Sequence, residues 1–360
     1  MSDPEHSLPR RRRARPLVII AWLAPALVLS SCSSRCGKKQ AAVEQSDAQV
    51  ASVELLDAGR PPLVTISVGR WAGLVYTSEL TNRTSVSAAG APAPNPPSAV
   101  MKVRFEVLHG TADPVVRPGP DGGARLVEER AVVESLEVRN PSAPPELLQK
   151  TNDALSSLVG TTMRQLVGED GAIVEVDTET VGGVVPPARI KQMIDNLWAT
   201  QRHFPFRLPP GPVGIGAHWR FSDPTERQGV RTIQVSDMTL VAMDDRTVTI
   251  RIRVQLAAPR QEVKNPMDPD AVAMLEQFRG EGEGELTLDR LTAVILSARL
   301  GEAATLKLSA YDTKGKQQFL TVVSAVRAEL RSVIGAPEAG APEPPSPAGP
   351  DAASPSVPGQ

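Results

Sequence analysis

The sequence predicts a mainly β fold of the α+β class, in which a curved antiparallel sheet, or half-barrel, packs over two or three helices. Long segments such as Val100–Leu108 alternate apolar and polar residues, and a period of two is typical of half-buried strands. Val248–Leu256 repeats this alternation after a turn at Asp244-Asp245, which indicates a hairpin. Such a sheet has to cover its apolar face, and amphipathic stretches in the middle of the chain would serve as the cover.

The chain begins with a basic block that is followed by a short apolar run. The block is Arg10–Arg15, the run is Leu17–Leu29, and small residues then lead to a cysteine in Ser30–Cys32. This order is the plan of a secretory signal peptide. A helix that crosses a bilayer needs about 20 apolar residues. The run here is shorter and contains Pro25, so a permanent transmembrane helix is the less favoured interpretation.

The end of that run, Leu29-Ser30-Ser31-Cys32, resembles the lipobox of bacterial lipoproteins. The resemblance implies cleavage before Cys32, whose thiol would take up a diacylglycerol and whose new amino group would carry a further acyl chain such as palmitate. Two or more acyl chains anchor a protein stably to a membrane. Ser33, where an aspartate would favour the inner membrane, favours an outer-membrane location facing the periplasm. The alternative is an ordinary secretory signal in which Cys32 occurs by chance.

Composition divides the chain into four parts. Residues 1–31 form the predicted lipoprotein signal peptide, and residues 32–62 a polar tether with a short helix near residues 47–56. Residues 63–335 are predicted to form a single antiparallel β-rich domain with inserted helices. Residues 336–360 are Pro, Ala, Gly and Ser with a few acids. Such a composition cannot bury enough apolar surface to offset the entropy of ordering, and it predicts a disordered tail.

Most of the predicted domain consists of strands that form an antiparallel meander. Residues 168–171 and 244–245 are rich in Gly and Asp, which tolerate the backbone angles of hairpin turns. The predicted strands are residues 73–86, 100–108, 127–138, 163–167, 172–178, 230–243, 246–256, 284–288, 293–300, 303–309 and 318–329.

Three stretches predict helices. Pro144–Val159 gathers its leucines near one stripe, and proline is tolerated in a first helical turn. Pro186–Trp198 places apolar residues at i, i+3, i+4, i+7 and i+8, the spacing of one helix face. Asp268–Phe278 is a shorter candidate. The face of the second helix, together with one later tryptophan, is the candidate apolar pocket, and its residues are Ile190, Met193, Ile194, Leu197, Trp198 and Trp219.

Two glycine-containing motifs stand out, Pro212–Trp219 with the sequence Pro-Val-Gly-Ile-Gly-Ala-His-Trp and Gly282–Asp289. The first is typical of a turn that brings the start of a strand against the sheet. It is no phosphate loop, because no Lys-Ser or Lys-Thr follows and no strand-to-helix context surrounds it. Together the motifs resemble a group of uncharacterised bacterial lipoproteins with a Pro-Val-Gly-x-Gly-x-x-Trp signature. The resemblance covers roughly residues 70–330. It implies a fold similar to the half-barrel of periplasmic lipoprotein carriers, and no activity.

Composition argues against several function classes. The net charge of −2 does not supply the basic face that nucleic acid needs, and aromatic residues at 3% supply few stacking platforms. With Cys32 acylated, Cys36 has no partner for a disulfide. We find no helical pair of histidines and no nucleophile motif, so we expect no enzyme, no metal and no cofactor. Glu281, Glu283, Glu285 and Asp289 could attract calcium loosely, but their alternation with Gly and Leu is typical of a solvated strand face.

Two functional hypotheses remain open. In the first, the protein is a non-catalytic, lipid-anchored envelope protein that binds a lipid or another apolar ligand in a cavity between sheet and helices. In the second, it is a structural or assembly lipoprotein that holds a protein partner in the envelope. A long apolar cavity favours the first hypothesis, whereas a filled core with an exposed apolar patch favours the second.

Overall fold

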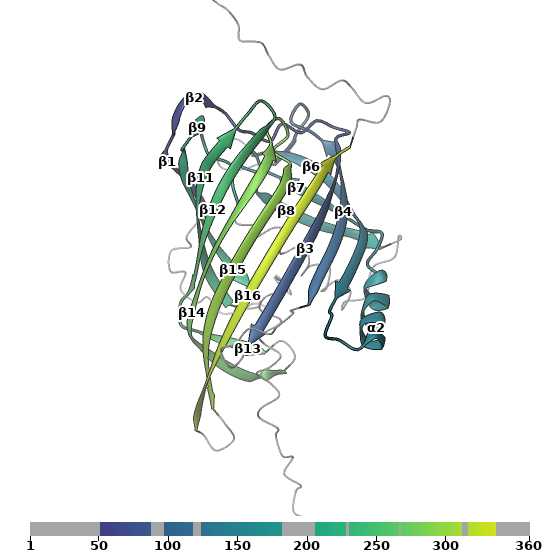
Figure 1. The fold of residues 1–360 in the computed structure, drawn as a ribbon, viewed down its shortest axis with the longest axis vertical. Helices are drawn as coiled ribbons and strands as arrows, with labels where there is room; N and C mark the ends of the chain where they lie inside the picture. The colour runs from purple at the N-terminus through teal and green to yellow at the C-terminus, as the bar shows by residue number, and fades with distance from the viewer. Residues whose placement is uncertain are drawn as a thin grey trace, which may run out of the picture.

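The computed structural model describes residues 51–87, 97–117, 124–181, 206–227, 230–265, 268–311 and 316–335. Within these ranges the chain is mainly β, with a 14-stranded antiparallel sheet, a separate two-stranded sheet and one helix (Figure 1). The predicted signal segment, Cys32 and the residues after 335 lie outside the described ranges. Among the described residues, no helix has the length and apolar character that crossing a membrane requires.

The large sheet contains all strands except two. Its strands are β1 (Ser52–Asp57), β3 (Val75–Ser87), β4 (Ser98–His109), β5 (Val115–Arg117), β6 (Ala124–Arg139), β7 (Thr161–Val167), β8 (Ile173–Val181), β10 (His218–Arg227), β11 (Val230–Met243), β12 (Thr247–Ala258), β13 (Gln261–Asn265), β14 (Asp268–Asp289), β15 (Ile295–Tyr311) and β16 (Gln317–Ile334). The small sheet pairs β2 (Arg60–Val64) with β9 (Val213–Ile215).

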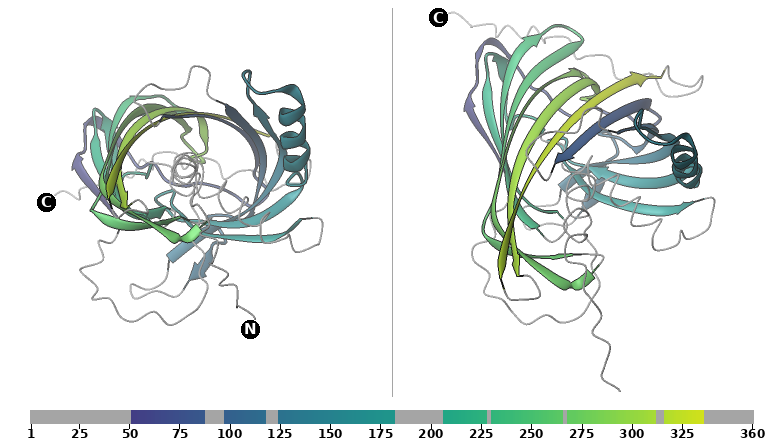
Figure 2. Two further views of the ribbon diagram at one scale, coloured as in Figure 1. Left: turned by 90° about the horizontal axis from the view of Figure 1, so that it is seen from below. Right: turned by 60° about the horizontal axis from the view of Figure 1, so that its bottom comes forward.

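The strand order places the last strand beside one from the first part of the described chain. The order is β1-β10-β11-β12-β14-β15-β16-β3-β4-β6-β7-β8, with β13 and β5 off this path. The last strand, β16, pairs with β3 from Val323↔Ser87 to Ile334↔Tyr76. Figure 2 shows the sheet curling about its long axis. The path starts at β1 and ends at β8, so the described strands form an open curved sheet, and the predicted antiparallel architecture is confirmed.

The two faces of the sheet have opposite characters. On β12, Val248, Ile250 and Ile252 are buried on the inner face while Arg251 and Arg253 are exposed on the outer face. The outer face carries charges of both signs in register, because Arg251 lies opposite Glu285, Glu285 opposite Arg299, and Arg299 opposite Glu329. Opposite charges on facing strands attract. The core therefore lies inside the curve, and the predicted alternation is confirmed.

The prediction of a helix at Asp268–Phe278 is wrong. These residues begin β14, which pairs with β13 and β15 there and with β12 from Phe278 onward, opposite Ala258. Helix propensity and local spacing are weak signals that tertiary context overrides. Hydrogen bonding to strands on both sides satisfies the backbone of this stretch in an extended form.

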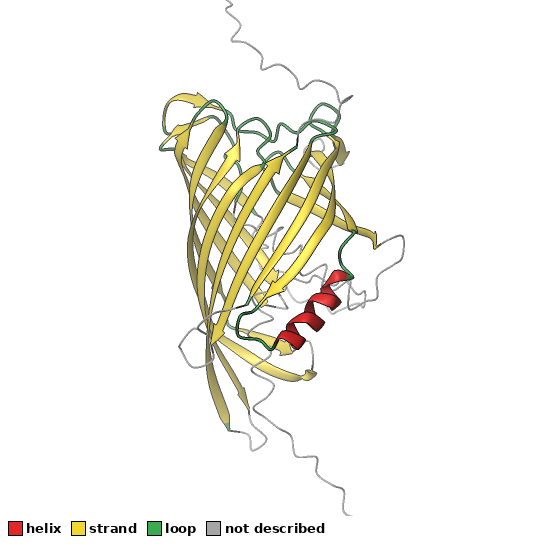
Figure 3. Cartoon of the chain, turned by 45° about the vertical axis from the view of Figure 1, so that its right-hand side comes forward, coloured by secondary structure: helices red, strands yellow, loops and turns green. Residues whose placement is uncertain are grey.

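The prediction of two or three helices beneath the sheet is also wrong for the described residues, which contain one. This helix, α2 (Pro145–Ser156), confirms the predicted helix at Pro144–Val159. It lies beside β6 and outside the curve (Figure 3), where the Asn152 side chain exchanges two hydrogen bonds with the backbone of Val138, at 2.8 and 3.1 Å. The predicted helix at 186–198 falls outside the described residues.

Strands also occur where the sequence predicted none. β1 lies within the predicted tether and β2 crosses its end, and the residues expected to form a helix near 47–56 are extended from 52 onward. β1 pairs with β10, with Val53 opposite Phe221 and Leu55 opposite Trp219, so these two apolar residues of β1 join the inner face. The segments predicted as separate strands at 293–300 and 303–309 form one strand, β15.

The Pro212–Trp219 motif forms the turn that its sequence predicts. β9 ends at Ile215, Gly216 has a φ of 90°, and β10 begins at His218. A Cβ on Gly214 would lie 1.9 Å from the carbonyl oxygen of Arg60, so only glycine allows β9 to approach β2 this closely. Trp219, one residue into β10, is fully buried in the core.

Candidate functional site

A cavity of about 140 Å³ lies on the inner side of the sheet. Strands β3, β4, β7, β8, β15 and β16 all contribute to its lining, together with the turns at Gly171 and Val294 and the segments around Arg70 and Phe206. None of the described residues of α2 lines it. The cavity therefore lies where the C-terminal strands meet the N-terminal ones.

Strand alternation builds the walls of the cavity. Tyr76, Ser78 and Leu80 on β3 share the inner face. The register places Ser332 opposite Ser78 and Leu330 opposite Leu80, and the two serine hydroxyls hydrogen bond at 2.7 Å. The ring of Phe105 stacks on that of Tyr76, with centroids 4.7 Å apart and planes at 9°. The result is a largely apolar wall that contains a few hydroxyl groups.

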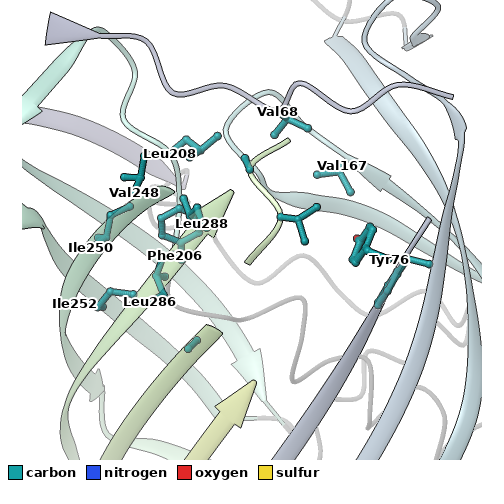
Figure 4. Packing of buried hydrophobic residues seen from close by; sticks show 14 of the residues in the cluster. Val68, Tyr76, Val167, Phe206, Leu208, Val248, Ile250, Ile252, Leu286 and Leu288 are labelled. Carbon is teal, nitrogen blue, oxygen red and sulfur yellow. The ribbon is translucent and has the colours of Figure 1, made fainter. Parts of the chain in front are cut away.

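A segment that is not a strand covers part of the interior. Phe206 and Leu208 are buried in the same cluster as Val248 and Leu288 of the opposite wall (Figure 4). In that view Tyr76 lies apart from them, across the interior. The backbone of this segment is held by hydrogen bonds, from the Leu208 N–H to the Asp170 carbonyl at 2.8 Å and from the Trp219 indole N–H to the Arg207 carbonyl at 2.9 Å.

A buried polar cluster borders the cavity and centres on Glu129 of β6. Glu129 is fully buried and accepts hydrogen bonds from Arg70 at 2.5 Å, Gln165 at 2.7 Å and Tyr76 at 3.0 Å. The Arg70 Nε–H donates in addition to the carbonyl of Thr292 at 3.2 Å. Three donors on two different strands and one connecting segment thus converge on a single carboxylate.

The protonation behaviour of the cluster follows from burial and pairing. Burial alone lowers the pKa of Arg70, but the nearby charges and the hydrogen bond to Glu129 together outweigh it, so this pKa lies above its ordinary value. Burial raises the pKa of Tyr76 well above its ordinary value, and the charge of Arg70 offsets part of the rise. At neutral pH, therefore, Arg70 is a cation and Tyr76 a neutral hydrogen-bond donor.

A second buried arginine, Arg207, lines the cavity. Its guanidinium lies 4.4 Å from the centroid of the Phe221 ring, and its Nη1 donates to the Phe206 carbonyl at 2.7 Å. Among the described residues, the carboxylate paired with it is that of Asp170, whose Oδ2 lies 3.7 Å from Nε. Burial lowers the pKa of Arg207, and the charges of Asp170 and Asp223 offset part of that effect. Arg207 thus has weaker ionic compensation than Arg70.

Of the predicted pocket residues, only Trp219 is among the described ones. It is fully buried in the core and does not line the cavity. Its indole N–H donates a hydrogen bond to the backbone carbonyl of Arg207, which does line it. The other five, Ile190, Met193, Ile194, Leu197 and Trp198, lie outside the described residues. Cys32 lies outside them as well.

The sequence interpretation did not find Arg70, Glu129, Gln165 or Arg207. Glu129 gave a usable signal, because the period of two through Val127, Ala131 and Val133 places it on the inner face. An acid at such a position requires a buried partner. The partner, Arg70, is 59 residues away in a connecting segment, and nothing in the sequence pattern identifies it.

Two acids of the Gly282–Asp289 motif lie on the outer face of the sheet, away from this site. Glu283 and Glu285 are exposed on the outer face of β14, opposite Arg253 and Arg251. Within the part of the chain that the structure describes, no group of three or more His, Cys, Asp or Glu residues is placed to hold a metal ion.

The chain matches no protein-family model, and no curated protein matches it either. The resemblance to a lipoprotein family, drawn from its motifs, therefore stays a prediction.

Proposed function

We propose that this chain is a lipid-anchored protein of the cell envelope that binds a lipid or another apolar ligand, without catalysis, in the cavity on the inner side of its sheet. The observation that carries this proposal is the cavity of about 140 Å³ with walls that include Leu80, Phe105 and Leu330. An engineered apolar cavity of about 150 Å³ binds benzene. A space of this size therefore holds one end of a larger apolar ligand.

The anchor part of the proposal rests on the sequence. The Leu29-Ser30-Ser31-Cys32 pattern supports acylation of Cys32, and Ser33 supports an outer-membrane location facing the periplasm. The resemblance of Pro212–Trp219 to a lipoprotein signature supports the same assignment.

The alternative, an assembly lipoprotein that holds a protein partner, predicts a filled core. A cavity between apolar strands favours ligand binding over that alternative. A scaffold gains stability from close packing, since an empty apolar space forfeits dispersion contacts.

The test is direct binding to a chain that lacks residues 1–32. Every described element lies after residue 50, so this chain keeps all of them and carries no acyl group. We expect native mass spectrometry to show co-purified apolar molecules, or calorimetry to show binding of added 1-octanol. Leu80→Trp fills the cavity and is expected to abolish both signals. Its control, Thr81→Trp, places the same ring on the opposite face of β3 and keeps them. Failure of the parent chain to bind any apolar molecule would rule the proposal out.

A further inference from the structure

Among the described residues, the charged side chains that line the cavity are all cationic. Among the described residues that line it, the only charged ones are Arg70 and Arg207, and no carboxylate lines it. Both side chains are almost fully buried, with exposed fractions of 10% and 11%. A cation in a mostly apolar enclosure is solvated poorly, and an anion there gains more from it than it would in water.

The two arginines differ in how well they are neutralised. Glu129 lies directly behind Arg70 and bonds to its Nη1 at 2.5 Å. Asp170 reaches Arg207 only at 3.7 Å, beyond hydrogen-bonding distance, and its side chain is 42% exposed. None of the described residues accepts a hydrogen bond from the Nη2 group of either arginine. Arg207 is thus the less well neutralised of the two cations, and the Nη2 group of Arg70 is still available as a donor.

We propose that the cavity binds an amphiphile with an oxyanion headgroup, a carboxylate or a phosphate, whose head pairs with Arg207 and whose apolar chain follows the wall formed by Leu80, Phe105 and Leu330. The planar guanidinium matches carboxylate and phosphate oxygens in a two-pronged geometry. The inference rests on the proposed function, because it names the class of ligand that the same cavity takes.

The experiment compares octyl compounds that differ only in their heads, by calorimetry on the chain lacking residues 1–32. We expect octanoate or octyl phosphate to bind at least about tenfold more tightly than 1-octanol. Octylammonium is expected to bind more weakly than 1-octanol. The comparison of octanoate with octyl phosphate distinguishes the two headgroups. Acetate and inorganic phosphate, which lack the chain, are expected not to bind.

Variants then assign the preference to Arg207. Arg207→Gln is expected to remove the preference, so that octanoate and octyl phosphate bind this variant no more tightly than 1-octanol binds it. Arg207→Lys should keep part of the preference, because it keeps the charge. The control is Arg220→Gln, which removes the same charge from an exposed arginine that pairs with Asp237 on the outer face. It should leave the ranking of the ligands unchanged.

The outcomes separate the two proposals. Equal affinity for octanoate, octyl phosphate and 1-octanol would overturn the headgroup assignment and leave apolar binding intact. A preference for an anionic head that persists in folded Arg207→Gln would also overturn the assignment to Arg207. Absence of binding by every octyl compound would overturn both proposals. If Arg207→Gln does not fold, the affinity ranking of the octyl compounds in the parent chain still decides whether the cavity prefers an anionic head. A purely apolar cavity would favour the uncharged head of 1-octanol.

Discussion

The ion pair between Arg70 and Glu129 ties together parts of the chain that are far apart in sequence. Arg70 belongs to the segment before β3, Glu129 to β6, and the Thr292 carbonyl that Arg70 also contacts to the β14–β15 turn. A buried charge pair is a weak source of net stability, but removing one partner leaves the other charge uncompensated in the interior. The pair therefore fixes the arrangement of these segments more than it stabilises the fold.

Double replacement tests this interpretation. Arg70→Met alone is expected to lower the free energy of unfolding by about 3–5 kcal/mol, because Glu129 would stay buried without its cation. Arg70→Met combined with Glu129→Met should cost less than the sum of the two single changes, since no charge remains. Urea unfolding measures all three variants.

The matched control is the exposed pair of Arg130, the neighbour of Glu129 on β6, and Glu106, which lies opposite it on β4. Arg130→Met should change the free energy of unfolding by less than about 1 kcal/mol, because water and salt screen exposed pairs. Full additivity of the two changes at Arg70 and Glu129 would contradict the idea that they form one electrostatic unit.

Residue-scale features were the hardest to predict. Alternation identifies which residues face inward, as it does along β12. It does not identify which distant residue supplies a buried counter-charge, because that depends on the order of strands in the sheet. The order β16-β3 joins residues that are about 250 positions apart, as in the pair of Ser78 and Ser332. The cavity lies at this junction, and its lining was therefore beyond prediction.

At the scale of elements, β14 shows how sequence and sheet shape are connected. Its glycines alternate with outward-facing acids, so Gly280, Gly282 and Gly284 take the inner positions. A Cβ on Gly284 would lie 2.4 Å from the carbonyl oxygen of Arg299 on β15, closer than side chains allow. Glycine within a strand often marks such a close backbone approach.

A pair of glycine substitutions tests this connection. Gly284→Ala is expected to lower the free energy of unfolding by about 1–3 kcal/mol, as overpacking does. Gly301→Ala on β15 is the control, because the nearest atom to its Cβ would be the Glu283 carbonyl oxygen at 4.0 Å. It should be neutral or stabilise by about 0.4–1 kcal/mol through the unfolded chain. Equal thermal midpoints for the two variants would show that close approach at Gly284 does not constrain the sheet.

Long, regular elements were predicted better than short or ambiguous ones. β4 and β12 follow from alternation, which a half-buried antiparallel sheet imposes directly, and β3, β6 and β11 were also predicted as strands. The start of β14 was mistaken for a helix, because short apolar runs have no decisive period. β1 and β2 were missed since their few apolar residues acquire partners only through long-range pairing with β10 and β9.

At the scale of the whole molecule, the fold and the proposed anchor occupy separate parts of the chain. All described strands and both apolar clusters lie after residue 50, whereas the predicted acylation site is Cys32. The outer face of the sheet is charged with both signs, as on Arg251 and Glu285, and such a face suits water rather than a lipid interior. Attachment to a membrane is therefore expected to depend on the acyl chains alone.

Replacement of the predicted acylation site tests that separation. In a bacterial host, Cys32→Ser is expected to lose incorporation of labelled palmitate and to move from the membrane fraction to the soluble fraction, because stable anchoring needs the acyl chains. Its thermal midpoint should equal that of the lipidated chain, since no described element includes Cys32. Cys36→Ser changes the only other cysteine and should keep both the label and the membrane location. A Cys32→Ser chain that still carries palmitate, or that stays with the membrane after an alkaline wash, would show that the anchor lies elsewhere.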